Sequence, residues 1–144
     1  MKRINIHIFG KIKNTSILTL CGKYVSLSNH YIKTEIKIHK DPGERKICLK
    51  DLPLLLAKLI ILTEKGKEYD SLAFSKFLFN KINDIDEANF ILGNGFGFDE
   101  NVLSASSSKL ALSQLTTTHE LALLILLEQI FRGLNIHANG KYHK

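Results

Sequence analysis

The sequence has 144 residues, of which 44% are hydrophobic and 24% charged, and these proportions are typical of one folded globular domain covering residues 1–144. Its cysteines, Cys21 and Cys48, form neither a C-x-x-C pair nor a disulfide framework, so we expect a cytoplasmic protein with reduced thiols. No apolar run approaches the roughly 20 residues that span a bilayer, and the first residues do not resemble a signal peptide. These features argue against secretion and against a membrane partner.

The net charge of +6 is unevenly distributed along the chain. Residues 1–67 contain fourteen lysines and arginines against five acidic residues, whereas residues 68–144 contain six against nine. A polyanion such as RNA would be attracted to the basic half, because neutralised phosphates release counterions. A lysine-rich soluble surface would give the same distribution, so charge alone leaves both interpretations open.

The first elements follow from the spacing of apolar residues. Alternation from Arg3 to Phe9 predicts a half-buried strand that ends at Gly10. Helical spacing predicts a helix over 14–27, and renewed alternation in "YIKTEIKIH" predicts a second strand, which ends at the turn "DPG" of residues 41–43. The run over 54–62 is apolar without alternation, which predicts a strand that is buried on both faces.

Strands and helices continue to alternate to the end of the chain. We predict a helix over 71–83, a strand over 88–92, a short helix over 99–106, a short strand over 110–113 and a last helix over 120–134. This order indicates an α/β fold with a mainly parallel sheet and helices on both faces. Such folds bind ligands beyond the carboxyl ends of their strands.

Three loops leave predicted strands at their carboxyl ends: "LTEKGKEYDS", "LGNGFGFDE" and "LSQLTTTHE". In a parallel sheet they point the same way, and the glycines at 93, 95 and 97 allow positive φ and close backbone approach to a ligand. The G-x-G-x-G spacing does not match a dinucleotide fingerprint, and "HELAL" lacks the second histidine of a zinc protease motif. The loops therefore indicate a small-molecule site without a metal.

The blocks "ILGNGFG", "LALSQLTTTHELALLILLEQIFRG" and "ANGKYHK", with "LTEKGKEYDS" upstream, resemble the RlmH family of ribosomal RNA methyltransferases, in the SPOUT superfamily. The resemblance implies a C-terminal trefoil knot and bound S-adenosyl-L-methionine, held by backbone groups of the three loops. Carried over by position, the cofactor-binding residues are Leu62, Gly93, Asn94, Leu112, Ser113, Gln114, Leu115, Thr116 and Thr117. The chain departs from the family pattern at Asn94, Thr118 and Leu123, which replace a glycine, a proline and an arginine.

The resemblance also implies a substrate, which is N3 of a pseudouridine in helix 69 of 23S ribosomal RNA in the assembled 70S ribosome. That nitrogen carries a proton, so the reaction needs basic or dipolar groups near the transferred methyl. The matching candidates for catalysis are Arg132, Tyr142 and His143. Plainer roles remain open, since Arg132 sits where it would offset a helix dipole and the terminal "KYHK" has the composition of a frayed tail.

Several further side chains have two interpretations each. His119 is expected to cap the last helix or to brace the loop before it, instead of catalysing. Phe96 and Phe98 either stack on adenine or a flipped base, or fold over the edge of the core. His7, His30, His39 and His137 have no common spacing, and we expect them on the surface.

The last predicted helix has apolar residues over most of its circumference, so a second subunit is expected to cover it. A symmetric homodimer of this kind would bury about 1,500 Å², and in knotted methyltransferases it would bring His143 of one chain near the cofactor of the other. Two alternatives remain. One is a catalytically weakened knotted RNA-binding or ribosome-assembly protein, favoured by Asn94 and Leu123, and the other is a SPOUT enzyme that acts on tRNA.

Overall fold

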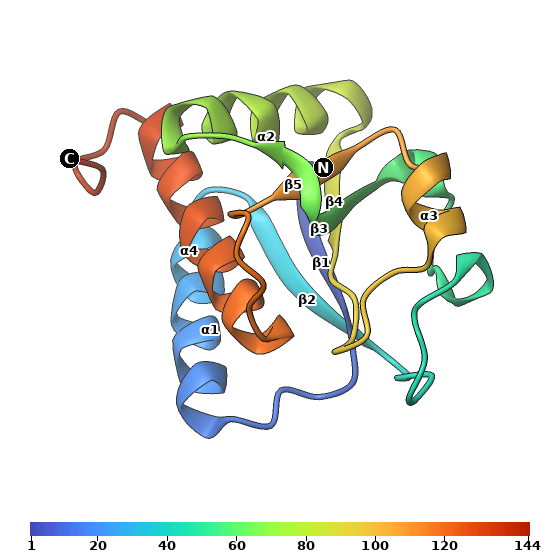
Figure 1. Ribbon diagram of the computed structural model, residues 1–144. Coiled ribbons are helices and arrows are strands. Elements are labelled where there is room, and N and C mark those ends of the chain that lie inside the picture. The colour runs from blue at the N-terminus through green and yellow to red at the C-terminus, as the bar shows by residue number, and fades with distance from the viewer.

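The computed structural model describes residues 1–144 and contains one five-stranded sheet, in the order β2-β1-β4-β3-β5 (Figure 1). Every pair of neighbouring strands is parallel. The strands are β1 Arg3–Phe9, β2 Lys33–His39, β3 Leu59–Glu68, β4 Glu87–Ile91 and β5 Lys109–Ala111. The helices are α1 Thr15–Ser28, α2 Ser71–Ile85, α3 Glu100–Ala105 and α4 His119–His137, with 3₁₀ turns at Leu49–Asp51 and Leu56–Lys58. The predicted α/β class with a parallel sheet is confirmed.

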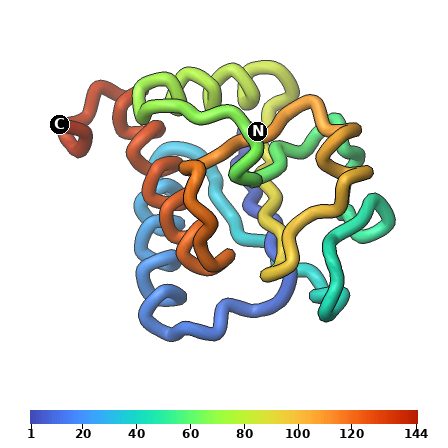
Figure 2. Tube along the Cα trace, in the orientation of Figure 1, coloured from blue at the N-terminus to red at the C-terminus, as the bar shows by residue number.

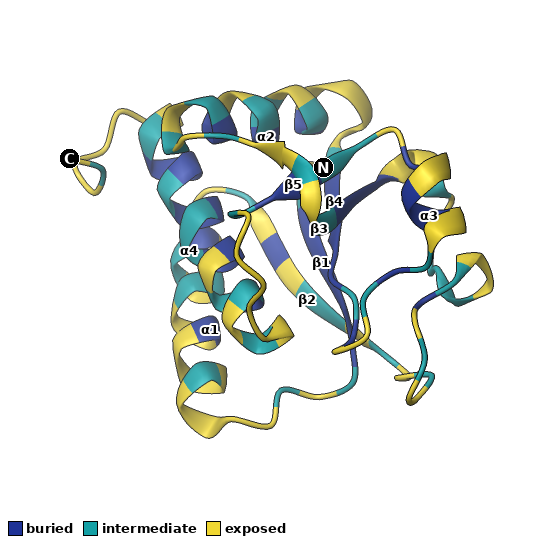
Figure 3. Cartoon of the chain, viewed as in Figure 1, coloured by how far each residue is buried: buried dark blue, intermediate teal, exposed yellow.

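Helices cover both faces of the sheet, as predicted. Ile4, Ile6 and Ile8 of β1 point into the larger core with α1, α2 and α4, whereas Phe9 joins a smaller core with α3. Figure 3 shows the central strands in the colour of buried residues, with exposed residues along the outer sides of the helices. None of the helices is long and apolar enough to span a membrane.

The strand predicted over 54–62 is displaced in the structure. Leu54 lies outside the sheet and residues Leu56–Lys58 form a 3₁₀ turn, so β3 begins only at Leu59. Leu54 and Leu56 are apolar because they pack against the smaller core. At its other end β3 continues through residues predicted as a loop, because both Leu62 and Lys67 pair with Leu110 of β5, on either side of an irregularity.

Two segments that are far apart in sequence cross where Gly66 meets β5. A Cβ atom at position 66 would lie 2.6 Å from the backbone nitrogen and carbonyl carbon of Leu110, so only glycine fits there. Figure 2 shows the chain of this part of β3, in green, passing β5, in orange. The trefoil knot itself stays a prediction from the resemblance.

The start of α4 is fixed by side chains on either side of His119. Thr118 Oγ1 accepts a hydrogen bond from Leu121 N at 3.3 Å and caps the helix, and His119 is its first residue, so the expected capping role of His119 is wrong. Glu120 accepts hydrogen bonds from the backbone N–H groups of Lys13 and Asn14 at 2.9 and 3.1 Å. These bonds hold the pKa of Glu120 below its ordinary value and tie α4 to the beginning of α1.

Most of α4 is buried within its own chain, against α1 and α2. The buried apolar residues of the helix are Leu123, Leu126, Leu127, Ile130, Phe131 and Leu134. We expected a second subunit because the helix has apolar residues over most of its circumference. That reason is wrong, because two helices of the same chain cover most of the apolar residues. Only Leu121 and Ile125 of α4 remain large, apolar and exposed, each at 44%.

Two of the histidines expected on the surface meet beside the sheet. His7 is 2% exposed, and its Nδ1 lies 2.9 Å from Nε2 of His39, which is half-buried. The rings stack with centroids 5.1 Å apart. The alternating pattern of β1 predicted that one face of the strand, which carries His7, would be exposed to solvent. In the structure the α3 side of the molecule covers that face.

Candidate functional site

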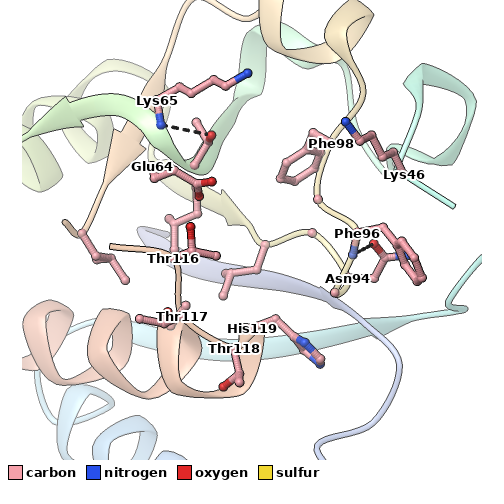
Figure 4. Close-up of a pocket in the computed structure, with 18 of the residues that line it drawn as sticks. Lys46, Glu64, Lys65, Asn94, Phe96, Phe98, Thr116, Thr117, Thr118 and His119 are labelled. Atoms are coloured by element: carbon pink, nitrogen blue, oxygen red, sulfur yellow. Dashed lines mark hydrogen bonds between the residues drawn. The ribbon is translucent and has the colours of Figure 1, made fainter. Parts of the chain in front are cut away.

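A cavity of about 730 Å³ lies beyond the carboxyl ends of β4 and β5, beside the irregular stretch of β3 (Figure 4). Its size falls within the range of small-molecule and cofactor sites, about 300 to 1,000 Å³. Its walls come from residues 62–65, 92–98 and 112–118, with the first turns of α4 below. The three segments that the sequence predicted as strand-end loops therefore share one cavity, although residues 62–65 belong to β3 and not to a loop after it.

The first wall begins at Leu62, where β3 becomes irregular. Thr63, Glu64 and Lys65 complete it, and the backbone N–H of Lys65 donates to Thr63 Oγ1 at 3.3 Å. The bend at this point lets the chain leave the pairing with β5 and rejoin it at Lys67. This wall is therefore formed from within β3.

The glycines of the second wall act in different ways. Gly97 has φ of 78°, a conformation that favours glycine. Gly93 has negative φ, but a Cβ there would lie 3.1 Å from the Cα of Gly97, so the two arms of the loop pack closely. Gly95 has open space around the position of a Cβ. A ligand can therefore approach the backbone at Gly95.

Asn94 lines the cavity, yet its side chain is only 7% exposed and is bonded elsewhere. Its Nδ2 donates to Arg45 O at 2.9 Å and also lies 3.2 Å from Gly43 O and from Asp41 Oδ1. Its Oδ1 accepts from Phe96 N at 3.0 Å. Asn94 does not adopt the left-handed conformation. It joins the glycine loop to the segment after β2, a role that glycine could not fill.

The third wall runs from Leu112 into α4. Ser113 Oγ accepts from Leu115 N at 3.0 Å, which shapes the turn. Leu115 is 77% exposed at its rim. The hydroxyl-bearing residues Thr116, Thr117 and Thr118 follow as lining residues. Of the nine residues expected at the cofactor, only Gln114 does not line the cavity.

Sequence reasoning missed part of the lining. Lys46 faces the cavity from the segment between β2 and the first 3₁₀ turn, a stretch without apolar periodicity. Ala122 and Ile125 reach it from the first two turns of α4. The two phenylalanines of the glycine loop separate: Phe98 is 6% exposed in the smaller core, whereas Phe96 is 52% exposed at the cavity.

The expected catalytic residues gather at the opposite end of α4. Arg132 Nη1 lies 3.0 Å from His143 Nδ1, and its guanidinium carbon stands 4.7 Å from the centre of the Tyr142 ring. Arg132 Nε donates to Glu128 Oε1 at 2.7 Å. None of the three lines the cavity. Arg132 follows His119 by thirteen residues of helix, which is about 20 Å along the axis.

The contact with Arg132 fixes the state of His143. A guanidinium only donates, so Nδ1 of His143 must accept and the proton of the neutral ring sits on Nε2. Burial is the main cause that raises the pKa of Tyr142 to about 12. The cluster therefore presents donor groups: a guanidinium, a phenol that stays protonated at neutral pH, and an imidazole N–H.

Comparison with known proteins agrees with this geometry. Residues 1–143 match the family described as "Predicted SPOUT methyltransferase". The chain is also 34% identical to ribosomal RNA large subunit methyltransferase H of Flavobacterium psychrophilum, over 97% of this chain and 98% of the relative. It belongs to the RlmH family of SPOUT methyltransferases.

Other members of the RlmH family align over a similar length. The protein of the same description from Malacoplasma penetrans is 34% identical, over 99% of both chains. The one from Dictyoglomus thermophilum is 35% identical, over 97% of this chain and 98% of the relative. The family resemblance stated from the sequence motifs is confirmed, and it extends over the N-terminal half as well.

Proposed function

We propose that this protein is an S-adenosyl-L-methionine-dependent methyltransferase acting on ribosomal RNA of the large subunit. Its target would be N3 of a pseudouridine in helix 69 of 23S RNA, in the assembled 70S ribosome of the cytoplasm. The observation that carries the proposal is the shared cavity, in which an irregular stretch of β3 and the loops after β4 and β5 of a SPOUT methyltransferase converge. The names of the similar proteins point to the same class of RNA.

The residues of the cavity suit S-adenosylmethionine. Leu62, Leu112 and Ile125 offer apolar contact of the kind that an adenine ring needs, while Ser113 and Thr116 offer hydroxyl groups. The open space at Gly95 leaves backbone groups accessible. When bound, the donor supplies a methyl on a sulfonium, which requires orientation more than activation. The loops would supply that orientation.

We propose a homodimer as the active form, because the donor cluster around Arg132 lies away from the cavity of its own chain. An exposed apolar strip of Leu115, Leu121 and Ile125 borders the cavity, and Leu115 and Ile125 also line it. A second copy packed on this strip would cover apolar surface and close the cavity. Its own Arg132, Tyr142 and His143 are then available at the mouth.

In this arrangement the three residues would act as donors to the base. Removal of the N3 proton leaves negative charge that spreads to the neighbouring carbonyl oxygens. The Arg132 guanidinium and the Nε2–H of His143 stabilise that charge, and the Tyr142 hydroxyl adds a third donor. Positive charge near N3 also favours the deprotonated base, so the N3 proton would leave to solvent water, and the cluster would need no strong general base of its own.

Methyl transfer to 70S ribosomes that lack the modification tests this function. We expect one labelled methyl group for each ribosome, mapped by mass spectrometry to N3 of a pseudouridine in helix 69, and we expect calorimetry to show S-adenosylmethionine binding without RNA. Donor binding without transfer would favour the alternative, a catalytically weakened RNA-binding or ribosome-assembly protein. The observation in its favour is Leu123, which is a buried apolar residue at a position where the family pattern has arginine. If tRNA became labelled and ribosomes did not, the substrate would be tRNA and not ribosomal RNA.

A further inference from the structure

Phe96 stands apart from the other phenylalanines of the chain. It is 52% exposed, and no other phenylalanine is among the exposed large apolar residues. Both Phe96 and Phe98 line the cavity, but Phe98 is buried because it also packs in the smaller core. A large ring left in water costs free energy unless something covers it in the working state.

The backbone beneath this ring is held firmly. Phe96 N donates to Asn94 Oδ1 at 3.0 Å, and Gly97 N donates to Asn94 O at 3.0 Å. Ile47 N in turn donates to Gly97 O at 2.8 Å. A short loop braced on both sides of Phe96 presents its ring at a fixed place, which lowers the entropy lost when a partner stacks on it.

Positive charge lies on the same side of the cavity. Figure 4 shows Lys46 with Phe96 and Phe98 on one side and Thr116, Thr117 and Thr118 on the other. Lys46 lines the cavity and belongs to the half of the chain that has fourteen basic and five acidic residues. Glu64, Lys65 and Glu100 also line it, so the cavity carries charges of both signs, and Lys46 is the cation beside the two phenylalanines.

We propose that Phe96 is a stacking platform for a nucleobase of the RNA substrate at the cavity mouth, with Lys46 contacting a neighbouring phosphate. Aromatic rings beside basic side chains are the means by which proteins hold unpaired bases. The inference rests on the proposed function, because it assumes that RNA comes to this cavity. It adds a residue that positions the base and that is separate from the donor cluster of Arg132.

The test measures RNA binding directly, so that it does not depend on methyl transfer. The probes are 70S ribosomes that lack the modification and a hairpin RNA of the helix 69 sequence with 2-aminopurine in its loop, each titrated with protein that is saturated with S-adenosylhomocysteine. Phe96→Ala should raise the Kd for each probe about tenfold, and Phe96→Tyr or Phe96→Trp should bring it back to near the wild-type value. Stacking should also quench the 2-aminopurine fluorescence in the wild type and not in Phe96→Ala.

Leu72→Ala is the matched control, because Leu72 is 53% exposed on α2 and does not line the cavity. It should leave the Kd unchanged. Lys46→Ala should reduce the slope of log Kd against log salt concentration by about 1, the change expected for the loss of one phosphate contact. Lys76→Ala on α2 should leave this slope unchanged.

Three results would overturn the inference. An RNA affinity equal in Phe96→Ala and wild type removes the platform. A weaker affinity for S-adenosylmethionine in Phe96→Ala, with RNA binding unchanged, would place the ring on the cofactor. A changed oligomeric state would place it on a second copy. If wild-type protein binds the hairpin through Phe96 but transfers no methyl, the inference stands and the proposed reaction fails.

Discussion

The contact between His7 of β1 and His39 of β2 makes the free energy of unfolding depend on pH. Burial, and then the charge of His39, lower the pKa of His7 to about 4. The unfolded chain has the ordinary value of about 6.5, so below that pH the unfolded state binds a proton that the folded state refuses. The contribution of neutral His7 to the free energy of unfolding is therefore complete above about pH 6.5. It falls as the pH is lowered from 6.5 and is lost by about pH 4. We expect a loss of about 3 kcal/mol from this residue between pH 7 and pH 4.

Urea unfolding at a series of pH values measures this effect. His7→Leu should flatten the decline of the unfolding free energy on acidification, whereas His30→Leu, at an exposed position, should decline as the wild type does. An equally steep decline in His7→Leu would assign the pH dependence to other groups.

Asn94 is the residue whose loss should loosen the cavity most directly. Asn94→Ala removes the donor to Arg45 O and Gly43 O and so cuts the link between the glycine loop and the segment after β2, so we expect about 1 to 3 kcal/mol of destabilisation and weaker S-adenosylmethionine binding. Denaturation and calorimetry measure the two effects. The control is Asn101→Ala, on the exposed side of α3. Unchanged donor affinity in Asn94→Ala would show that the loop does not need this brace.

The lining residues at strand ends were predictable because parallel strands end on the same side of a sheet. Leu62, Gly93 and Leu112 were found in this way and from the resemblance. Lys46 was not predicted, because it belongs to a segment without apolar periodicity. Hydrogen bonds between that segment and the glycine loop place it at the cavity. The burial of His7 was also hidden, since alternation does not tell which face is covered.

Among the elements, the crossing of β3 and β5 is the most sensitive to substitution. Gly66→Ala would put a methyl group 2.6 Å from the backbone of Leu110, where no flexible side chain can give way. We expect several kcal/mol of destabilisation or a failure to fold, measured by thermal unfolding and by soluble yield.

Gly22→Ala in α1 is the matched control, because a Cβ there meets nothing within 4 Å. This change should stabilise the protein by about 1 kcal/mol, since alanine favours a helix. A Gly66→Ala protein as stable as wild type would mean that β3 and β5 do not cross closely.

At this scale the order of elements was predictable and some of their boundaries were not. Caps and apolar spacing identified α1, α2 and α4 to within a few residues. The beginning of β3 was misplaced because Leu54 and Leu56 are apolar for packing outside the sheet. Its extension beyond Leu62 depends on pairing with Leu110, which is over forty residues away and leaves no local signal.

For the whole molecule, the proposed dimer assigns the cavity to one chain and the donor cluster to the other. Two inactive variants should then complement each other: Gly95→Trp, which fills the open space of the cavity, and Arg132→Ala, which removes the guanidinium. Mixed and re-equilibrated, they should form heterodimers with one intact site and recover up to about a quarter of wild-type methyl transfer.

The apolar strip supplies the control for that experiment. Leu121→Glu with Ile125→Glu, placed in both variants, should prevent dimerisation and abolish the recovery, as light scattering and methyl transfer would show. Recovery that persists in monomers, or no recovery in stable heterodimers, would contradict catalysis across two chains.

The central claim is that three separate loops hold one methyl donor, and hydrogen exchange with and without S-adenosylmethionine tests it most directly. We predict that the donor slows amide exchange together in residues 62–65, 92–98 and 112–118, with little change along the outer face of α2. Protection confined to a single loop, or found only at the C-terminal tail, would contradict the account.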